Sequence, residues 1–226
     1  MWNSQVIIML LEGIRDTLYM TLASTLFGYI IGLPMGIVLT VTDKDGIRPN
    51  AAVYKVLDVI SNLLRSIPFI ILLIVLIPFT RFVVGRSYGS TATIVPLTIA
   101  AAPYIARMVE SSLKEVDAGV IEAARSMGAS DFQIVTKVML VEARTSLIVG
   151  ATISLGTILG YSAMAGTVGG GGLGDIAIRY GYTRWQTDIM VVTVVLLVIL
   201  FQIFQTIGMK IANRLDRRNC LLYTSP

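Results

Sequence analysis

The chain has 226 residues, of which 55% are hydrophobic and only 14% charged, with a formal net charge of +4. Soluble domains carry about 25% charged residues, so this composition indicates a membrane protein and disfavours a soluble nucleic-acid binder. The chain has no histidine and one cysteine, Cys220. These counts exclude an internal disulfide and remove the commonest general base and transition-metal ligand.

Long uncharged segments predict an all-α membrane protein with about five transmembrane helices. A hydrocarbon core about 30 Å thick needs roughly 20 apolar residues in helical form. The expected spans are residues 17–42, 59–80, 87–113, 145–166 and 189–209. We expect a membrane domain over 17–211 and a cytoplasmic tail over 212–226.

The first sixteen residues predict an extracytoplasmic segment that does not cross the membrane. Its apolar run, Val6–Leu11, is too short to span and predicts a short helix at the membrane surface. Charges at Glu12, Arg15 and Asp16 interrupt the run before any cleavage-like site, which disfavours a cleavable signal peptide.

The basic residues predict the orientation. With the N-terminus outside, twelve of the 18 Lys and Arg residues fall in inner segments, five in outer segments, and Arg65 within a span. The outer five are Arg15, Arg81, Arg86, Arg179 and Arg184. The positive-inside rule therefore places the N-terminus outside and the C-terminus in the cytoplasm.

Small residues and prolines recur within the spans. Small residues every fourth position let helix backbones approach closely, and a proline inside a helix favours a kink. The glycines at this spacing are Gly28, Gly32, Gly36, Gly156 and Gly160, and the prolines are Pro34, Pro68, Pro78, Pro96 and Pro103. Their density favours a bundle with a moving pathway over a plain anchor.

The connection between the third and fourth spans, residues 114–142, is the only extended polar region. Asp117 predicts a helix N-cap, and Gly128 predicts the end of that helix in a left-handed conformation. Ser130 or Asp131 can cap the next helix. The first helix carries Ile121, Ala124 and Met127 at helical spacing, and the second carries Phe132, Val135 and Val138.

Within this connection stand Glu122, Ala123, Ala124, Arg125 and Gly128. The spacing resembles the E-A-A, three residues, Gly pattern of permeases of binding-protein-dependent ABC importers. The family pattern continues beyond the glycine and has a proline at the position where this chain has Val141. The chain departs from the pattern at this position. The resemblance implies that residues 117–130 form a coupling helix held in a groove of an ATPase subunit. Glu122 would contact the ATPase, the two alanines would permit close approach, and Gly128 would form the turn.

Further runs resemble the permeases of methionine importers: residues 65–69, 160–166 and 169–174. The resemblance covers about residues 10–218 and implies an ATP-driven importer of an amino acid, methionine, across the bacterial plasma membrane. It also implies two copies of the permease, two ABC ATPase subunits and an extracytoplasmic binding protein or lipoprotein. The tail Leu221–Pro226 has no counterpart in it, and we assign that tail no function.

Gly169, Gly171 and Gly174 satisfy the G-x-G-x-x-G spacing, but the run follows a membrane span, so nucleotide binding is not expected. The glycine-rich run is better explained as a tight turn on the outer face or as a loop that moves beneath the binding protein. The chain has no G-x-x-x-x-G-K-[ST] motif. We therefore expect no enzyme activity and no cofactor on this chain, with ATP-Mg used by the partner ATPase.

Met164 is the one long side chain in its small-residue run, so it could plug a narrow pathway and retract. Ser154, Tyr161 and Ser162 could line the same path. Routine packing is the alternative for all four. Arg65 costs about 2.5–3.5 kcal/mol if it lies at a helix centre, so it either snorkels to the inner surface or serves a function.

Other functions were weighed. An ion-coupled secondary transporter needs acidic or histidine residues inside the membrane, and the five spans carry essentially no Asp or Glu at their centres, with Asp58 near one end. A structural subunit would not explain the polar connection, and no span carries a nucleophile with a base. An ABC permease for another small solute stays open, because the coupling pattern does not name the cargo.

Overall fold

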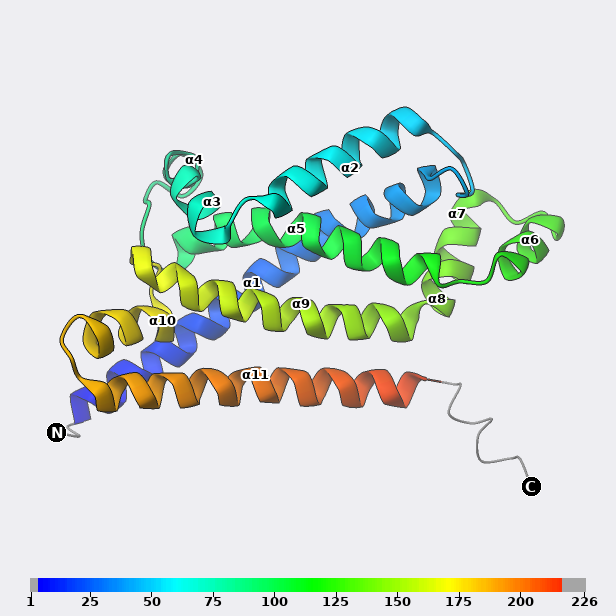
Figure 1. Cartoon of the computed structure of the whole chain (residues 1–226). Helices are drawn as coiled ribbons and strands as arrows, with labels where there is room; N and C mark the ends of the chain where they lie inside the picture. Colours follow the sequence, from blue (N-terminus) through cyan, green and yellow to red (C-terminus); the bar gives the residue numbers. More distant parts are fainter. Residues whose placement is uncertain (1–3, 217–226) are drawn as a thin grey trace, which may run out of the picture.

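The computed structural model describes residues 4–216, and this part of the chain is helical with no strand (Figure 1). Eleven α-helices are joined by two π-helices and one 3-10 turn within these residues. The elements are α1 Ser4–Thr42, α2 Ala51–Ser66, α3 Phe69–Val75, α4 Ile77–Val84, α5 Ser90–Lys114, α6 Ala118–Ser126, α7 Asp131–Gln133, η1 Ile134–Met139, α8 Leu140–Glu142, α9 Arg144–Ala165, η2 Gly166–Val168, α10 Gly172–Ile176, η3 Ala177–Tyr182 and α11 Thr187–Leu215. Cys220 and the tail lie outside the described residues.

The predicted separate surface helix at Val6–Leu11 is wrong. These residues belong to α1, a single helix of 39 residues that is about 58 Å long. No proline or turn separates the short apolar run from the first span, and Gly13 continues the helix while packing against Leu173 and Ile176. The first span is therefore the C-terminal part of a helix that is longer than the thickness of a hydrocarbon core.

The small residues of α1 hold it against α5. A Cβ on Gly32 would lie 2.6 Å from the carbonyl oxygen of Ala102, and Gly28 and Gly36 meet α5 in the same way. Only glycine permits this approach, as the fourfold spacing predicted. Gly156 similarly receives the ring of Phe201 from α11, whereas a Cβ on Gly160 would meet nothing within 4 Å.

The second expected span is not a single helix. The chain leaves α2 at Ser66, and α3 then runs at 102° to α2. Pro68 disfavours the helical conformation of Ile67, which is extended (φ −82°, ψ 124°). The sequence predicted a kink at Pro68, and the structure instead ends the helix there. Four helices are long and apolar enough to cross a membrane, or five if the bent pair counts as one span.

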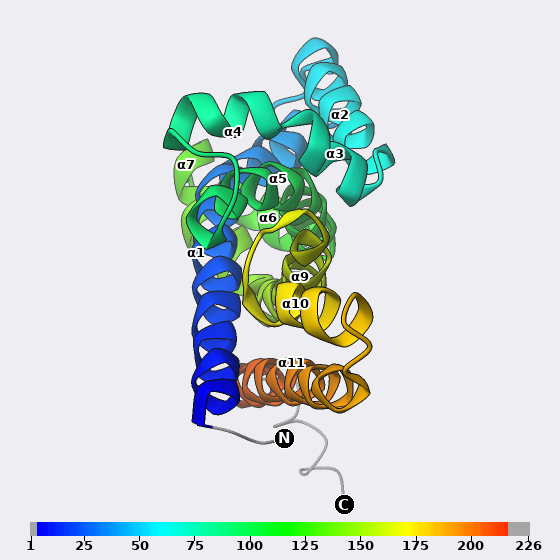
Figure 2. The ribbon, with the colours of Figure 1, turned by 90° about the vertical axis from the view of Figure 1, so that its left-hand side faces the viewer.

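The remaining three spans agree with the prediction within a few residues: α5, α9 and α11 correspond to 87–113, 145–166 and 189–209. Figure 2 shows α5 and α9 in the middle of the bundle, with α1 and α11 outside. Two thirds of the most apolar window of α5 is buried, against 6% for α11. The core therefore forms around α5, and α11 presents an apolar face to its surroundings.

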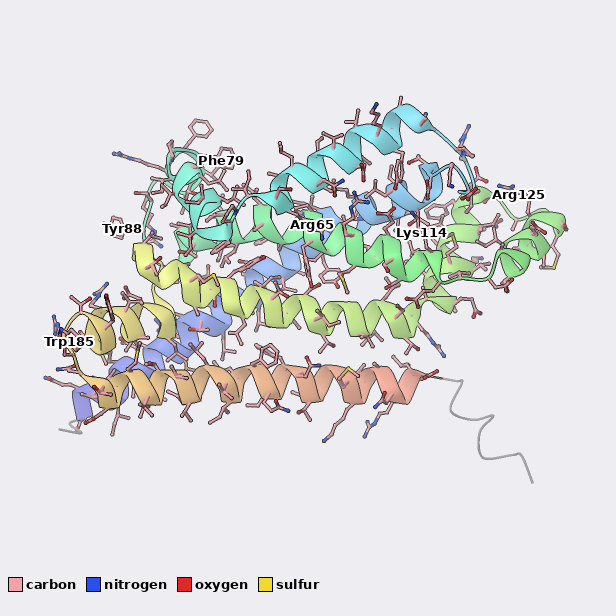
Figure 3. The ribbon with its side chains drawn as sticks, in the orientation of Figure 1. Arg65, Phe79, Tyr88, Lys114, Arg125 and Trp185 are labelled. Carbon is pink, nitrogen blue, oxygen red and sulfur yellow. The ribbon has the colours of Figure 1, made fainter. Side chains whose placement is uncertain are left out.

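The two ends of the bundle differ in character. Figure 3 shows Lys114 and Arg125 at the end that carries α6, and Phe79, Tyr88 and Trp185 at the opposite end. The three aromatic side chains are exposed. Aromatic residues are enriched where a membrane meets water, so this end has the character of an interface.

Candidate functional site

The polar connection folds into a short capped helix, α6, beyond the ends of the long helices (Figure 1). The Asp117 carboxylate accepts a hydrogen bond from the Gly119 amide at 2.7 Å, so Asp117 is the N-cap, as predicted. Ser130, rather than Asp131, caps α7 and exchanges hydrogen bonds with Gln133 in a capping box. The first residues of α6 and α7 are thus determined by capping residues that lie next to each helix in the sequence.

Gly128 ends α6 in the left-handed conformation, with φ +81°, as its position predicted. The Gly128 amide donates to Arg125 and the Ala129 amide to Ala124, at 3.0 and 3.1 Å. These two bonds are those of a Schellman motif, which satisfies carbonyls that a helix end would otherwise leave free. A side chain at Gly128 would strain this turn.

The candidate coupling residues lie on different faces of α6. Glu122, Ala123 and Arg125 are exposed, whereas Ala124 is 4% exposed and packs in the main core. Of the two alanines, therefore, only Ala123 is open to a partner. Arg125 donates to the Ile47 carbonyl at 2.8 Å, which ties α6 to the connection between α1 and α2.

Met127 does not share the burial of Ala124, since its side chain is 82% exposed. Met127 follows the last residue of α6, so helical spacing no longer sets its direction. Phe132 is also exposed, at 76%, while Val135 of the same segment is buried. Val120 of α6 is exposed as well, so periodicity alone did not predict which apolar side chains of this segment face outward.

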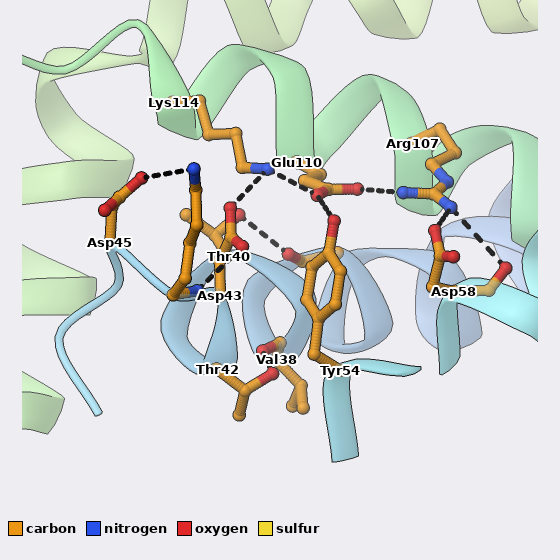
Figure 4. Close-up of polar contacts among 12 residues, drawn as sticks. Val38, Thr40, Thr42, Asp43, Asp45, Tyr54, Asp58, Arg107, Glu110 and Lys114 are labelled. Carbon is orange, nitrogen blue, oxygen red and sulfur yellow. Dashed lines mark hydrogen bonds and ion pairs between the residues drawn. The ribbon is translucent and has the colours of Figure 1, made fainter. Parts of the chain in front are cut away.

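A network of charged side chains lies next to α6, at the ends of α1, α2 and α5 (Figure 4). Glu110 is its centre, with its side chain 5% exposed. One carboxylate oxygen accepts from Lys114 at 2.8 Å and the other from Arg107 at 2.7 Å. The Tyr54 hydroxyl of α2 donates to Glu110 at 3.3 Å.

The two cations carry the network to neighbouring elements. Arg107 also pairs with Asp58 of α2, and Lys114 pairs with Asp43 at 2.7 Å. The hydrogen bond from Lys114 holds the pKa of Asp43, which follows α1, below its ordinary value. A cavity of about 430 Å³ separates the 43–47 connection from α6. The connection thus contacts α6 through Arg125 and α5 through Asp43.

The glycine-rich run makes a close crossing of backbones. Gly169, Gly171 and Gly172 have positive φ, and Gly166 and Gly174 leave no space for a Cβ against neighbouring backbone. The run follows α9 and η2 and precedes the five-residue α10, with no strand among residues 4–216. It lacks the strand that the dinucleotide fingerprint requires. The Thr17 hydroxyl accepts from the Leu173 amide at 2.9 Å and fixes α10 against α1.

The four candidate pathway residues are all on α9, but their surroundings differ. Ser154 and Ser162 are buried and donate to the Gly150 and Leu159 carbonyls, both at 2.8 Å. Tyr161 is half-buried and stacks on Phe69 of α3, with ring centroids 4.6 Å apart. Met164 is 47% exposed. Tyr161 and Met164 therefore keep contact surface for a solute, and the two serine hydroxyls already have partners.

Residues 28–219 match the model of a protein family described as binding-protein-dependent transport system inner membrane component. The chain belongs to this family. This permease is therefore a membrane component of a transport system, and the predictions of a multi-pass membrane protein and a transport subunit are confirmed.

Named relatives cover most of the permease. Probable D-methionine transport system permease protein MetI of Vibrio cholerae serotype O1 is 48% identical over 210 residues, 93% of each chain. D-methionine transport system permease protein MetI of Escherichia coli K12 is 54% identical over 158 residues, 70% of this chain and 73% of its own. A solved structure of the MetNI methionine ABC transporter in inward-facing conformations has a TM-score of 0.94 and 50% identity. It covers 96% of this chain and 100% of its own.

Sequence reasoning missed the buried charge network of the permease. Hydropathy treats Arg107, Glu110 and Lys114 as the polar end of a span, and their spacing of three and four residues signals only local pairing. Their partners Asp43 and Asp58 lie about 50–70 positions away along the chain. Only the packing of α2 and α5 brings these groups together.

Proposed function

We propose that this chain is the membrane-spanning subunit through which an ATP-driven importer moves methionine across the plasma membrane. The observation that carries the proposal is the match to the MetNI methionine ABC transporter over 96% of this chain at 50% identity. Relatives named as D-methionine permeases support the same cargo. An importer of another small solute would share the coupling helix, so the cargo is the part to be tested first.

The ATPase subunit docks on residues 117–130 and the adjoining surface. Glu122, Ala123 and Arg125 present charge and a small contact point, and Met127 and Phe132 present apolar area. Buried apolar area with a few charged contacts is typical of specific interfaces. Ala124 packs α6 against the core, and Gly128 forms the turn that ends the helix. The ATPase holds ATP-Mg, and this chain binds no cofactor.

The working assembly contains two copies of this chain, two ATPase subunits and an extracytoplasmic binding protein. The N-terminus lies outside and the C-terminus in the cytoplasm, because Lys114, Arg125 and the other inner basic residues gather at the α6 end. The binding protein then faces the end with Phe79, Tyr88 and Trp185. Residues 1–16 precede the membrane domain of 17–211, and 212–226 form the cytoplasmic tail.

Met164 acts as a gate and Tyr161 lines the path in this scheme. The thioether of Met164 is flexible and apolar, so it can close a narrow passage and withdraw. The hydroxyls of Ser154 and Ser162 are already bonded to backbone carbonyls of α9. These two residues therefore contribute to the path by stabilising the backbone and not by binding the solute with their hydroxyls.

The deciding experiment reconstitutes the chain with its ATPase subunit in liposomes and adds the binding protein outside. Uptake of labelled L- and D-methionine is measured with internal ATP or with a non-hydrolysable analogue. Uptake that requires both ATP and this chain supports the proposal. ATP-dependent uptake of other solutes but not of methionine would change the cargo. Uptake that survives without ATP and collapses with an ion gradient would instead indicate a secondary transporter.

Gly128→Val tests the coupling turn in the same liposomes. Valine at φ +81° is strained and should reorient Met127 and the end of α6. We expect normal membrane insertion with uptake reduced by about ten-fold or more. Val198→Ala, a change at an exposed position of α11 outside residues 117–130, is the control and should leave uptake unchanged. Unchanged uptake by Gly128→Val would contradict the coupling assignment.

A further inference from the structure

A small, partly open pocket lies where α2 ends and α3 begins, and it is lined on its other sides by α5 and α9. Its volume is about 220 Å³, and its lining includes Arg65, Phe69, Ala100, Tyr104 and Tyr161. One cation, two phenol rings and a phenyl ring therefore meet in a space bounded by four helices. Figure 3 places Arg65 between α2 and α5.

The cavity lies deep in the bundle when measured from the α6 end. Arg65 is 14 residues after the start of α2, and Ala100 is 14 residues before the end of α5, about 21 Å along each helix. Tyr161 is 17 residues into α9, about 26 Å. An arginine side chain is much shorter than 21 Å, so the guanidinium of Arg65 stays far from the α6 end of the bundle.

Arg65 has no anionic partner within this chain. Among residues 4–216, no carboxylate lies within ion-pairing distance of Arg65, and its side chain makes no hydrogen bond. Arg107 on α5 is different, because Asp58 and Glu110 both pair with it. A cation inside a membrane usually faces a partner or a water-filled path. The exposed Arg65 therefore has its guanidinium available to an anion from outside the chain.

We propose that this cavity is a transient site for the transported amino acid, in which Arg65 binds the carboxylate and the Phe69–Tyr161 ring pair receives the side chain. The inference rests on the proposed function and names a site within it. A guanidinium forms paired hydrogen bonds with a carboxylate in a fixed geometry. The stacked rings, 4.6 Å apart with planes 5° from parallel, line the pocket, and a thioether sulfur packs favourably against aromatic rings, often at the ring edge.

The bend at Pro68 gives this site a means of release. Arg65 is on α2, Phe69 is on α3, and the two helices meet at 102°. The two halves of the site thus stand on separate helices joined by two residues. A change in the bend would part the carboxylate contact from the ring contact. Transport requires such a site to bind weakly and to let go.

The test uses the complete complex in liposomes with a radiolabelled diazirine analogue of methionine, activated by light during ATP-driven uptake. We expect the label on peptides that contain Phe69 or Tyr161, and competition by excess methionine. Arg65→Met should reduce this labelling by about ten-fold or more, because hydrogen bonds to charged groups are strong. Arg65→Lys keeps the charge and should retain part of it. Lys55→Met, at an exposed position on the same helix, is the matched control and should label as the unaltered protein does.

Methionine uptake separates this inference from the proposed function. If the unaltered complex takes up no methionine, the proposed function fails. If it does, and Arg65→Met labels and transports normally, only the inference fails. Label that never reaches α3 or α9 during active uptake would also overturn it. So would an Arg65→Met complex that dissociates on size-exclusion chromatography, since Arg65 would then pair with the second copy.

Discussion

Glu110→Gln is the most informative single change in the charge network. The Glu110 carboxylate is almost fully buried and accepts from Lys114, Arg107 and Tyr54. Glutamine has nearly the same shape but only one acceptor atom, and its amide donors would face one of the two cations. The substitution therefore leaves the packing in place and removes the charge that the cations share.

The expected loss follows from this arrangement. Breaking a buried ion pair by removing one partner costs about 3–5 kcal/mol. Arg107 retains Asp58 and Lys114 retains Asp43, so neither cation is left unpaired. We therefore take the lower limit, about 3 kcal/mol of unfolding free energy. For a chain of this size, that corresponds to a decrease of about 6–12 °C in the thermal unfolding midpoint.

The assay is thermal unfolding of the purified complex in detergent, followed by the fluorescence of a thiol-independent dye. Glu115→Gln is the matched control, because Glu115 is the exposed C-cap of α5 and its side chain joins no ion pair in the described chain. We expect a shift of less than about 1 °C for it. Equal shifts for the two variants would refute the view that Glu110 stabilises this end of the bundle.

Three further predictions test other parts of the structure. Glu122→Lys should insert normally but lower ATP-driven uptake by about ten-fold, because reversed charge meets the ATPase groove; undiminished uptake at equal expression would contradict the docking assignment. Gly32→Leu should lower the unfolding midpoint, because overpacking against α5 costs about 3 kcal/mol. Gly160→Ala is the control, since the added Cβ has open space and should leave the midpoint unchanged. Similar midpoints for the two variants would count against the α1–α5 contact. Because the hydrogen bond from Lys114 lowers the folded-state pKa of Asp43, that pair stabilises the fold above the ordinary aspartate pKa of about 3.9 and ceases to do so as the pH falls through the lowered value. The midpoint difference between Asp43→Asn and the unaltered protein should thus be constant from pH 7 to 5 and shrink below about pH 4, and a difference that persists in acid would contradict it.

The sequence by itself determined the features that depend on local chemistry. Hydropathy located α5, α9 and α11 within a few residues, because apolar length alone decides whether a segment can cross a bilayer. Asp117 and Gly128 predicted the start and end of α6, since capping and the left-handed turn involve residues only a few positions apart. Glycine spacing likewise predicted the close face of α1.

Only the tertiary structure decided the features that depend on distant partners. Pro68 predicts a break in the helix but not the direction that α3 takes after the break. That direction is associated with the packing of Phe69 on Tyr161, which lies 92 positions further along the chain. Hydropathy could not show that Glu110 is buried in a charge network, because Tyr54 and Asp58 come from α2 and Asp43 follows α1, whereas Glu110 and its two cations are on α5. The unpartnered Arg65 is visible only when all neighbouring helices are in place. An apolar pattern fixes which segments are buried in the membrane, whereas the side chains that meet inside are fixed by how those segments pack.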